Sequence, residues 1–205
     1  MNILIILASF NGVKHIKQQI DSILSQKDVN IDLKIFDDGS SDGTVELISS
    51  IFSSDRIQII QNENPTGSSA KNFFQALQQI EEVCFEKYNY IAFADQDDIW
   101  LPNKLKEASI ILDIQEADLY MSNLILWQEK SNQKSIVNKA FSQKKYDYLF
   151  EGGSAGCTYV FSSKFALKLK ENIKNNSWPI WKNIIQLIYG ASLNNYPILI
   201  KKILR

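Results

Sequence analysis

Residues 90–100, Tyr-Ile-Ala-Phe-Ala-Asp-Gln-Asp-Asp-Ile-Trp, join an apolar run with strand character to three carboxylates within four residues. Asp95, Asp97 and Asp98 repel one another, so the cluster is costly unless a cation lies among its oxygens. Mg²⁺ and Mn²⁺ prefer oxygen ligands, and Mg²⁺ is usually held by one or two carboxylates together with substrate phosphates. We take Asp98 as the cap of the helix that opens near Pro102, which leaves two carboxylates for a divalent metal ion.

The first half of the chain alternates strand and helix patterns. Ile3–Ala8 is continuously apolar, as in a strand that is buried on both faces. Further strands are predicted at Ile31–Phe36, Arg56–Gln61 and Tyr90–Ala94. Helices are predicted at His15–Gln26, from about Thr44 to Phe52, at Ala70–Phe85 and from Pro102 to about Ile114. This alternation predicts an α/β fold with a mostly parallel sheet between two layers of helices.

The second half is less regular. A strand is predicted at Leu119–Gln128, a turn at Glu129–Gln133, a flexible loop at Gly152–Gly156 and a strand at Cys157–Phe161. Helices are predicted at Lys164–Asn172 and Trp181–Tyr189, and Pro197–Leu204 is a short strand or helix. Because there is no repeat, low-complexity tract or Pro-rich linker, we predict one domain over residues 1–205.

Composition limits the class of protein. The chain has 205 residues, 45% of them hydrophobic and 22% charged, which suits a sizeable core. A formal net charge of -1 argues against a nucleic-acid partner. Cys84 and Cys157 have apolar surroundings, so we expect reduced core thiols in a cytoplasmic protein. No segment has transmembrane length without charges. The basic residues near the end of the sequence form either a solvated surface or a peripheral membrane contact: Lys182, Lys201, Lys202 and Arg205.

Polar clusters follow three of the predicted strands, at residues 9–12, 37–40 and 95–98. In an open parallel sheet, ligands bind beyond the carboxyl ends of the strands, so we expect the three clusters to converge. Asp37 and Asp38 either build a turn or accept hydrogen bonds from a base or a ribose. Phe10 either stacks on a base or is a half-buried aromatic residue of the loop.

Three residues outside these clusters are also candidates for the site. Trp100 is expected to wall the pocket rather than to fill the core. Lys71 and Asn72 follow Gly67-Ser68-Ser69, and they either meet a phosphate or ribose or lie on a solvated helix face.

The chain resembles family-two glycosyltransferases of the GT-A fold, whose Rossmann-like sheet matches the predicted one. Five pieces carry the resemblance, in the family's order and over roughly residues 1–165: residues 8–12 (Ala-Ser-Phe-Asn-Gly), 37–44 (Asp-Asp-Gly-Ser-Ser-Asp-Gly-Thr), 71–73 (Lys-Asn-Phe), 95–100 (Asp-Gln-Asp-Asp-Ile-Trp) and 156–158 (Gly-Cys-Thr). The form of residues 95–100 is most similar to a bacterial branch labelled rhamnosyltransferase-like, which decorates surface polysaccharides.

The resemblance implies that a sugar is transferred from a UDP- or dTDP-sugar to a hydroxyl of a glycan or lipid-linked acceptor, with inversion, at the inner face of the membrane. It divides the chain into a donor half, 1–115, and an acceptor half, 116–205. Asp95 and Asp97 would hold Mn²⁺ or Mg²⁺, with Asp97 as the more direct ligand. The other residues that it places at the donor are Ser9, Phe10, Asn11, Asp37, Asp38, Lys71, Gln96 and Trp100. Those that it places beside the transferred sugar and the acceptor are Gly156, Cys157 and Thr158.

Two features depart from the family's pattern. Inversion by direct displacement needs a general base, which the family supplies as an Asp or Glu at the start of a late helix. The comparable stretch here, Ser177–Trp181, has no carboxylate, and Glu151 is a weak substitute. The chain also stops at Arg205, before the segment that closes over the donor phosphates in family members. Together, these departures suggest a truncated or degenerate member of the family, with an incomplete acceptor half.

Three readings of the function remain open at this stage. The first is an active, metal-dependent inverting glycosyltransferase. The second is a catalytically impaired homologue that binds nucleotide sugars. The third is another metal-dependent α/β protein such as a nucleotidyltransferase, although residues 9–12 lack the glycines and the arginine expected of its first loop.

Overall fold

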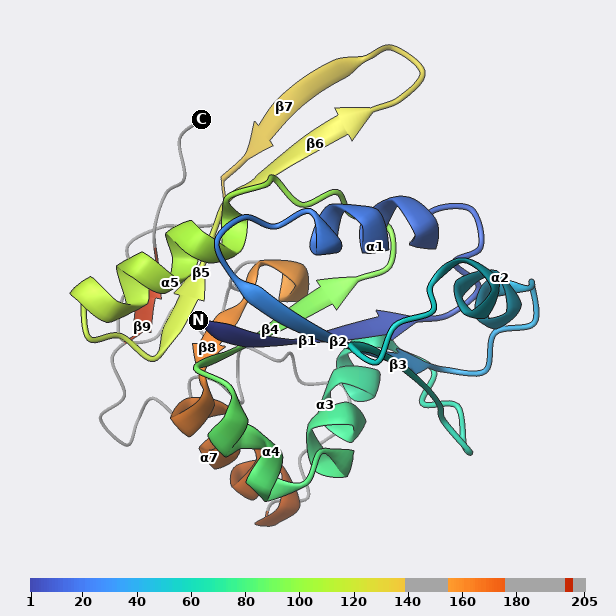
Figure 1. The fold of residues 1–205 in the computed structure, drawn as a ribbon. Coiled ribbons are helices and arrows are strands. Elements are labelled where there is room, and N and C mark those ends of the chain that lie inside the picture. The colour runs from blue at the N-terminus through green and yellow to red at the C-terminus, as the bar shows by residue number, and fades with distance from the viewer. Residues whose placement is uncertain (139–154, 176–197, 201–205) are drawn as a thin grey trace.

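The computed structural model describes residues 1–138, 155–175 and 198–200. Its centre is a seven-stranded sheet with the strand order β3-β2-β1-β4-β8-β5-β9 (Figure 1). Strands β1 to β4 are mutually parallel, β8 is antiparallel to its neighbours β4 and β5, and β9 is parallel to β5. The mostly parallel sheet predicted from the sequence is confirmed. The strands of this sheet span Asn2–Ser9 (β1), Asn30–Asp37 (β2), Ile57–Gln61 (β3), Tyr90–Asp95 (β4), Leu119–Met121 (β5), Val160–Ser162 (β8) and Ile198–Ile200 (β9).

Helices cover both faces of the sheet (Figure 1). Alternate residues of β1 enter two separate cores, with Leu4 and Ile6 in one and Ile3 and Ile5 in the other. The continuous apolar run of β1 is thus buried on both faces, as expected of a parallel sheet between helix layers. One core is closed by α3 (Ser69–Gln79), α4 (Glu82–Lys87) and α7 (Ser163–Asn175), and the other by α1 (Ile16–Leu24), α2 (Thr44–Ile51) and α5 (Lys104–Ile114).

The predicted helix Ala70–Phe85 is wrong in one respect, because it is two helices. Ile80 ends α3 with extended backbone angles (φ −71°, ψ 124°), and Glu81, also extended, precedes α4. Ile80 is buried in the core with Phe85. Helical spacing of apolar residues continues across the break, so the periodicity alone does not reveal it.

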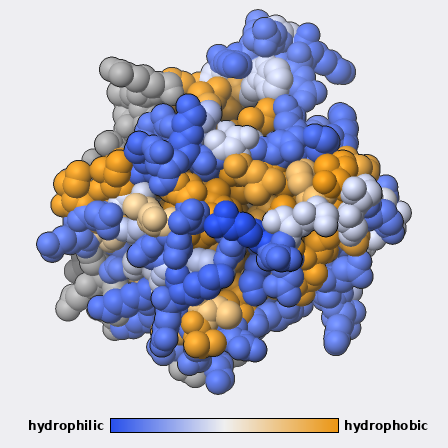
Figure 2. Space-filling view, in the orientation of Figure 1, coloured by the Kyte–Doolittle hydropathy of each residue, from blue (hydrophilic) through white to orange (hydrophobic). Residues whose placement is uncertain are grey.

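The predicted strand Leu119–Gln128 is also two elements. β5 is buried in the main sheet, whereas β6 (Leu124–Gln128) pairs with β7 (Gln133–Val137) in a separate hairpin. The turn predicted between them is confirmed. The hairpin projects from the body of the molecule (Figure 1), and its surface is largely hydrophilic in the view of Figure 2, although Leu126 and Trp127 are exposed.

The strand predicted at Cys157–Phe161 is shorter than expected. Its first residues form a 3-10 turn, η1 (Gly156–Thr158), and only β8 is extended. Cys157 is buried, Cys84 is half-buried, and both are free thiols. The predicted helix Trp181–Tyr189 lies outside the described residues. In the described parts of the chain, no helix has both the length and the apolar character needed to cross a bilayer.

Candidate functional site

The carboxyl ends of β1, β2 and β4 meet at one edge of the sheet. In the register of the strands, Ser9 pairs with Asp37 and Ala8 pairs with Asp95. The predicted convergence of the three polar clusters is therefore confirmed. A cavity of about 440 Å³ opens at this edge. From the three clusters it is lined by Ser9, Phe10, Asp38, Asp95, Gln96 and Asp97, and from the loop before α3 and from α3 itself by Pro65, Gly67, Ser68, Ser69 and Asn72.

Asp37 organises the turn that follows β2. Its carboxylate is buried and accepts hydrogen bonds from the hydroxyls of Ser9 (2.7 Å) and Ser40 (2.6 Å). It also accepts from the backbone N–H groups of Gly39 (3.2 Å) and Ser40 (2.8 Å). Asp37 does not line the cavity. Of the two interpretations of Asp37, the structure favours the builder of a turn.

Asp38 lines the cavity and holds the loop that leads to α3. Its carboxylate accepts from Thr66 twice (N–H at 2.7 Å, hydroxyl at 3.0 Å), from the Gly67 N–H (2.9 Å) and from the Asn62 amide (3.0 Å). Burial raises the pKa of Asp38, but these hydrogen bonds outweigh burial and hold that pKa below its usual value. The carboxylate is therefore an ionised acceptor at the cavity wall.

Asn72 extends this network behind the cavity. Its amide donates to the carbonyl of Phe36 (2.8 Å) and accepts from the Asn62 amide (3.0 Å). The residue is buried, so the solvated alternative for Asn72 is wrong. Lys71 is half-buried on the first turn of α3 and is not one of the lining residues.

Gln96 forms two hydrogen bonds with the backbone of Phe10. Its Oε1 accepts from the Phe10 N–H (2.8 Å) and its Nε2 donates to the Phe10 carbonyl (2.9 Å). This pair of hydrogen bonds fixes the start of the loop and leaves the Phe10 side chain 53% exposed at the cavity. The exposed ring agrees with a stacking surface and not with a half-buried loop aromatic.

Asn11 is held against the turn after β2. It lies in the left-handed region (φ 49°), its N–H donates to the Ser40 hydroxyl (2.8 Å), and its side-chain oxygen accepts from the Ser41 N–H (2.9 Å). Small polar side chains tolerate this conformation because they bond locally to the backbone. Asn11 thus joins the loop after β1 to the loop after β2.

Gly12→Ala should disrupt the two hydrogen bonds between Gln96 and the backbone of Phe10. A methyl group on Gly12 would lie 2.3 Å from Gln96 Oε1, so the amide must move and lose its two bonds. We expect a destabilisation of about 1–2 kcal/mol in urea unfolding. Gln96→Ala removes the same bonds, so the double variant should be little worse than either single one. Additive losses would show that Gly12 matters for another reason.

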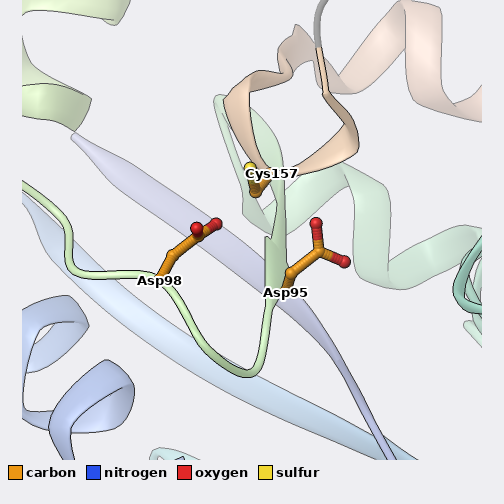
Figure 3. A group of neighbouring side chains, drawn as sticks. All are labelled: Asp95, Asp98 and Cys157. Carbon is orange, nitrogen blue, oxygen red and sulfur yellow. The ribbon is translucent and has the colours of Figure 1, made fainter. Parts of the chain in front are cut away.

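Asp95, Asp98 and Cys157 form a cluster beside the cavity, which Asp95 also lines. One ligand atom of each lies within 4.8 Å of the others, and Figure 3 shows Cys157 arriving from a different segment to lie beside the two carboxylates. Burial, reinforced by the charges of Asp98 and Asp97, raises the pKa of Asp95 to about 6. Burial also raises the pKa of Asp98, against hydrogen bonding from the Cys157 thiol.

This cluster fits a divalent metal ion. Oδ2 of Asp98 is buried and finds no hydrogen-bond partner among the described residues, and Asp97 projects its exposed carboxylate at the neighbouring cavity. The carboxylate oxygens of Asp95, Asp97 and Asp98 are the donors that Mg²⁺ and Mn²⁺ prefer. Asp98 does not cap α5, because Asn103 occupies the cap position.

Trp100 is a core residue rather than a wall of the cavity, which corrects the prediction made from the sequence. It is 5% exposed, packs in the core with Leu105 and Ala108, and does not line the cavity. The face of its ring instead receives the ammonium group of Lys104, 3.2 Å from the ring centroid. The sequence reasoning missed Lys104. The signal available was a lysine in the first turn of a predicted helix, where the helix dipole disfavours positive charge.

The turn η1 lies beside the end of β4. The Thr158 N–H and hydroxyl both bond to the Ala155 carbonyl (2.9 and 2.8 Å), and Cys157 and Thr158 are buried. None of Gly156, Cys157 and Thr158 lines the cavity. Glu151, the weak candidate for a general base, and Ser177–Trp181 lie outside the described residues.

The fold and the motifs at its strand ends define a class of protein. The model of the family described as Glycosyl transferase family 2 matches residues 4–171, and the chain belongs to this family. The fold is the GT-A fold. The solved structure of S. aureus TarS residues 1–349 in complex with UDP-GlcNAc matches it with a TM-score of 0.70 at 18% identity, covering 100% of this chain and 59% of that one.

Two curated proteins are particularly similar to this chain. It is 40% identical over 172 residues to a dTDP-rhamnosyl transferase, RfbG, of Shigella flexneri, covering 83% of this chain and 58% of that protein. It is 33% identical over 160 residues to WfgD of Escherichia coli, a UDP-Glc:alpha-D-GlcNAc-diphosphoundecaprenol beta-1,3-glucosyltransferase, covering 76% and 58%. The chain thus spans less than two thirds of the length of these relatives.

Proposed function

We propose that this protein is a glycosyltransferase that moves a sugar from a dTDP- or UDP-sugar to a hydroxyl of a glycan or lipid-linked acceptor in bacterial surface polysaccharide synthesis. The observation that carries the proposal is the cavity that Asp38, Asp95 and Asp97 share at the ends of adjacent parallel strands. The similarity to a dTDP-rhamnosyl transferase and to a UDP-glucose-dependent enzyme supports these two donor classes. Family membership weakens the nucleotidyltransferase alternative.

Each side of the cavity has a proposed role. The Phe10 ring is the stacking surface for the base, and the Asp38 carboxylate is an acceptor for N–H or O–H groups of base or ribose. Asp95 and Asp97, with Asp98 behind them, hold Mn²⁺ or Mg²⁺. A divalent ion there would neutralise the charge that grows on the diphosphate as it leaves.

Inversion at the anomeric carbon remains a proposal drawn from the family. It requires a base that removes the proton of the acceptor hydroxyl. The part of the chain that the structure describes does not identify this base. Removal of a general base typically costs ~10²–10⁴-fold in rate, so a homologue without one can still bind its donor.

The direct test is a panel of UDP- and dTDP-sugars with and without MnCl₂, followed by release of the nucleoside diphosphate and by thermal stabilisation. A donor that raises the melting temperature only with Mn²⁺, and is turned over with acceptor, supports the active enzyme. Stabilisation without turnover of any donor supports the alternative, an impaired nucleotide-sugar-binding homologue. Neither stabilisation nor turnover would reject both.

A further inference from the structure

Lys104 connects three segments that are distant in the sequence. It stands at the start of α5, its ammonium lies 3.2 Å from the centroid of the Trp100 ring, and it donates to the Cys157 carbonyl at 2.6 Å. The negative charges of Asp98 and Asp95 also act on it. The loop after β4, the first turn of α5 and the turn η1 therefore meet at one cation.

This position is unfavourable for a lysine unless its neighbours compensate. A positive charge at the N-terminus of a helix opposes the helix dipole. Burial lowers the pKa of Lys104 to about 7, and the negative groups around it oppose that shift. The carboxylates and the face of Trp100 are what retain the ammonium there.

Cys157 is held from two sides. Its carbonyl accepts from Lys104, and its thiol lies within 4.8 Å of a carboxylate oxygen of Asp98 and of Asp95. The neighbouring amides are also hydrogen-bonded. The Thr158 N–H donates to the Ala155 carbonyl, and the Tyr159 N–H donates to the Gly156 carbonyl. The turn η1 is therefore closed by its own backbone bonds and contacts Lys104 through the Cys157 carbonyl.

The charges of the cluster also fit this arrangement. With every group ionised, the carboxylates of Asp95, Asp97 and Asp98 and the ammonium of Lys104 carry two net negative charges, which one divalent ion would neutralise. Without the lysine the carboxylates would be closer to a self-repelling state, and the acidic loop would have no cation to hold it before an ion arrives.

We propose that Lys104 is a positioning residue: through the Trp100 ring and the Cys157 carbonyl, its ammonium locks the loop after β4 to the turn η1, so that binding of a divalent ion and a nucleotide at residues 95–98 of that loop orders the turn. The second half of this statement rests on the proposed function. The lock itself does not, because it is built into the protein without ligand. Through this coupling, ligand binding in the first half of the chain would affect the order of η1 in the second half.

The test is hydrogen exchange at the Thr158 and Tyr159 amides, measured with and without UDP or dTDP and MnCl₂. Lys104→Met keeps the length of the side chain but removes the charge and the donor. We expect ~10-fold faster exchange in the free variant, because a hydrogen bond from a charged donor is lost. We also expect the variant to lose the slowing that nucleotide and Mn²⁺ cause in the unmodified protein.

Two variants separate positioning from packing. Lys106→Met, two residues further along α5, removes an exposed lysine that pairs with Asp28 and should leave both amides unchanged. Lys104→Arg restores the charge and a donor, so exchange should return towards the original rate. A role in packing alone predicts the reverse order, with Met tolerated and Arg harmful. Unchanged exchange in Lys104→Met would overturn the proposal.

Failure of this proposal is distinguishable from failure of the proposed function. If neither nucleotide slows exchange in the unmodified protein, nucleotide binding fails, while the comparison of free variants still tests the lock. If Lys104→Met does not fold, Lys104→Gln, a shorter polar side chain without the charge, tests it instead. Exchange at the Thr158 and Tyr159 amides should then be faster than in the unmodified protein. Unchanged exchange would contradict the lock.

Discussion

Asp97→Ala is expected to abolish the Mn²⁺-dependent part of the affinity for UDP or dTDP. The Asp97 carboxylate is exposed and lines the cavity beside Asp95, so its removal takes away a ligand without disturbing a packed group. Stability should stay within about 0.5 kcal/mol, as is usual for surface substitutions. Calorimetric titration of each nucleotide with and without MnCl₂ measures the metal-dependent difference directly.

The matched control is Asp55→Ala, which removes an exposed carboxylate from the turn before β3, on the opposite edge of the sheet from the cavity. It should leave the affinity unchanged in both conditions. Asp98→Ala adds a second comparison, since Asp98 joins Asp95 and Cys157 in the buried cluster. If Asp98→Ala loses the Mn²⁺ effect and Asp97→Ala keeps it, the ion lies in the buried cluster and our assignment of Asp97 is wrong.

The edge of the sheet that carries the site was predictable because local signals show where each strand ends. The apolar runs of β1, β2 and β4 each end in a polar cluster, and parallel strands bring their carboxyl ends together. A one-residue change in the strand register would have moved the side chains of Asp37 and Asp95 to the other face of the sheet. The observed pairing of Ser9 with Asp37 and of Ala8 with Asp95 is the one that brings the clusters together.

The roles of individual side chains in the site were less predictable, because they depend on contacts between distant segments. Asp37 and Asp38 are adjacent in the same short turn sequence. Asp37 closes its own turn, whereas Asp38 holds a loop 28 residues away. Trp100 follows the acidic residues at the cavity, but its ring packs in the core with residues of α5. No periodicity separates these outcomes.

Dependence on tertiary contacts also explains why α3 and α4 were predicted as one helix, and β5 and β6 as one strand. The break at Ile80 occurs where apolar residues keep their helical spacing, and β6 leaves the main sheet after Ser122 and Asn123, between two apolar runs. Apolar spacing favours a helix or a strand, but it does not show where the element ends or which partner it packs against. Tertiary packing decides where each element ends, and neither boundary carries a glycine or a proline.

The walls of the cavity are held in place by bonds within the protein. Asp38, Gln96 and Asn11 each tie one loop to another, so the walls of the cavity are fixed before a ligand enters. Preorganised sites bind more tightly because less freedom is lost on binding. This arrangement has a consequence for Asp38, whose acceptor positions are already occupied by four donors.

Asp38→Asn is expected to lower both the stability and the nucleotide affinity. Replacing one carboxylate oxygen by an NH₂ group sets donor against donor and leaves at least one N–H or O–H group of Thr66, Gly67 or Asn62 unpaired. The loss should be about 2–4 kcal/mol in urea unfolding, since bonds to a charged acceptor are lost and buried donors are left unpaired. Thr66→Val removes one of the four bonds, so its loss of unfolding free energy should be smaller than that of Asp38→Asn.

The pH dependence provides an independent check on this prediction. The pKa of Asp38 is held below its usual value, so its stabilisation is present above the ordinary carboxyl pKa and is lost as the pH falls through the lowered one. The difference in stability between the unmodified protein and Asp38→Asn should therefore narrow below about pH 4. A ligand group that donates to Asp38 must share or displace a bond from Thr66 or Gly67, so Asp38→Asn should bind UDP and dTDP more weakly even where it is fully folded. Equal affinity of the folded variant would show that Asp38 holds the loop and does not contact the nucleotide.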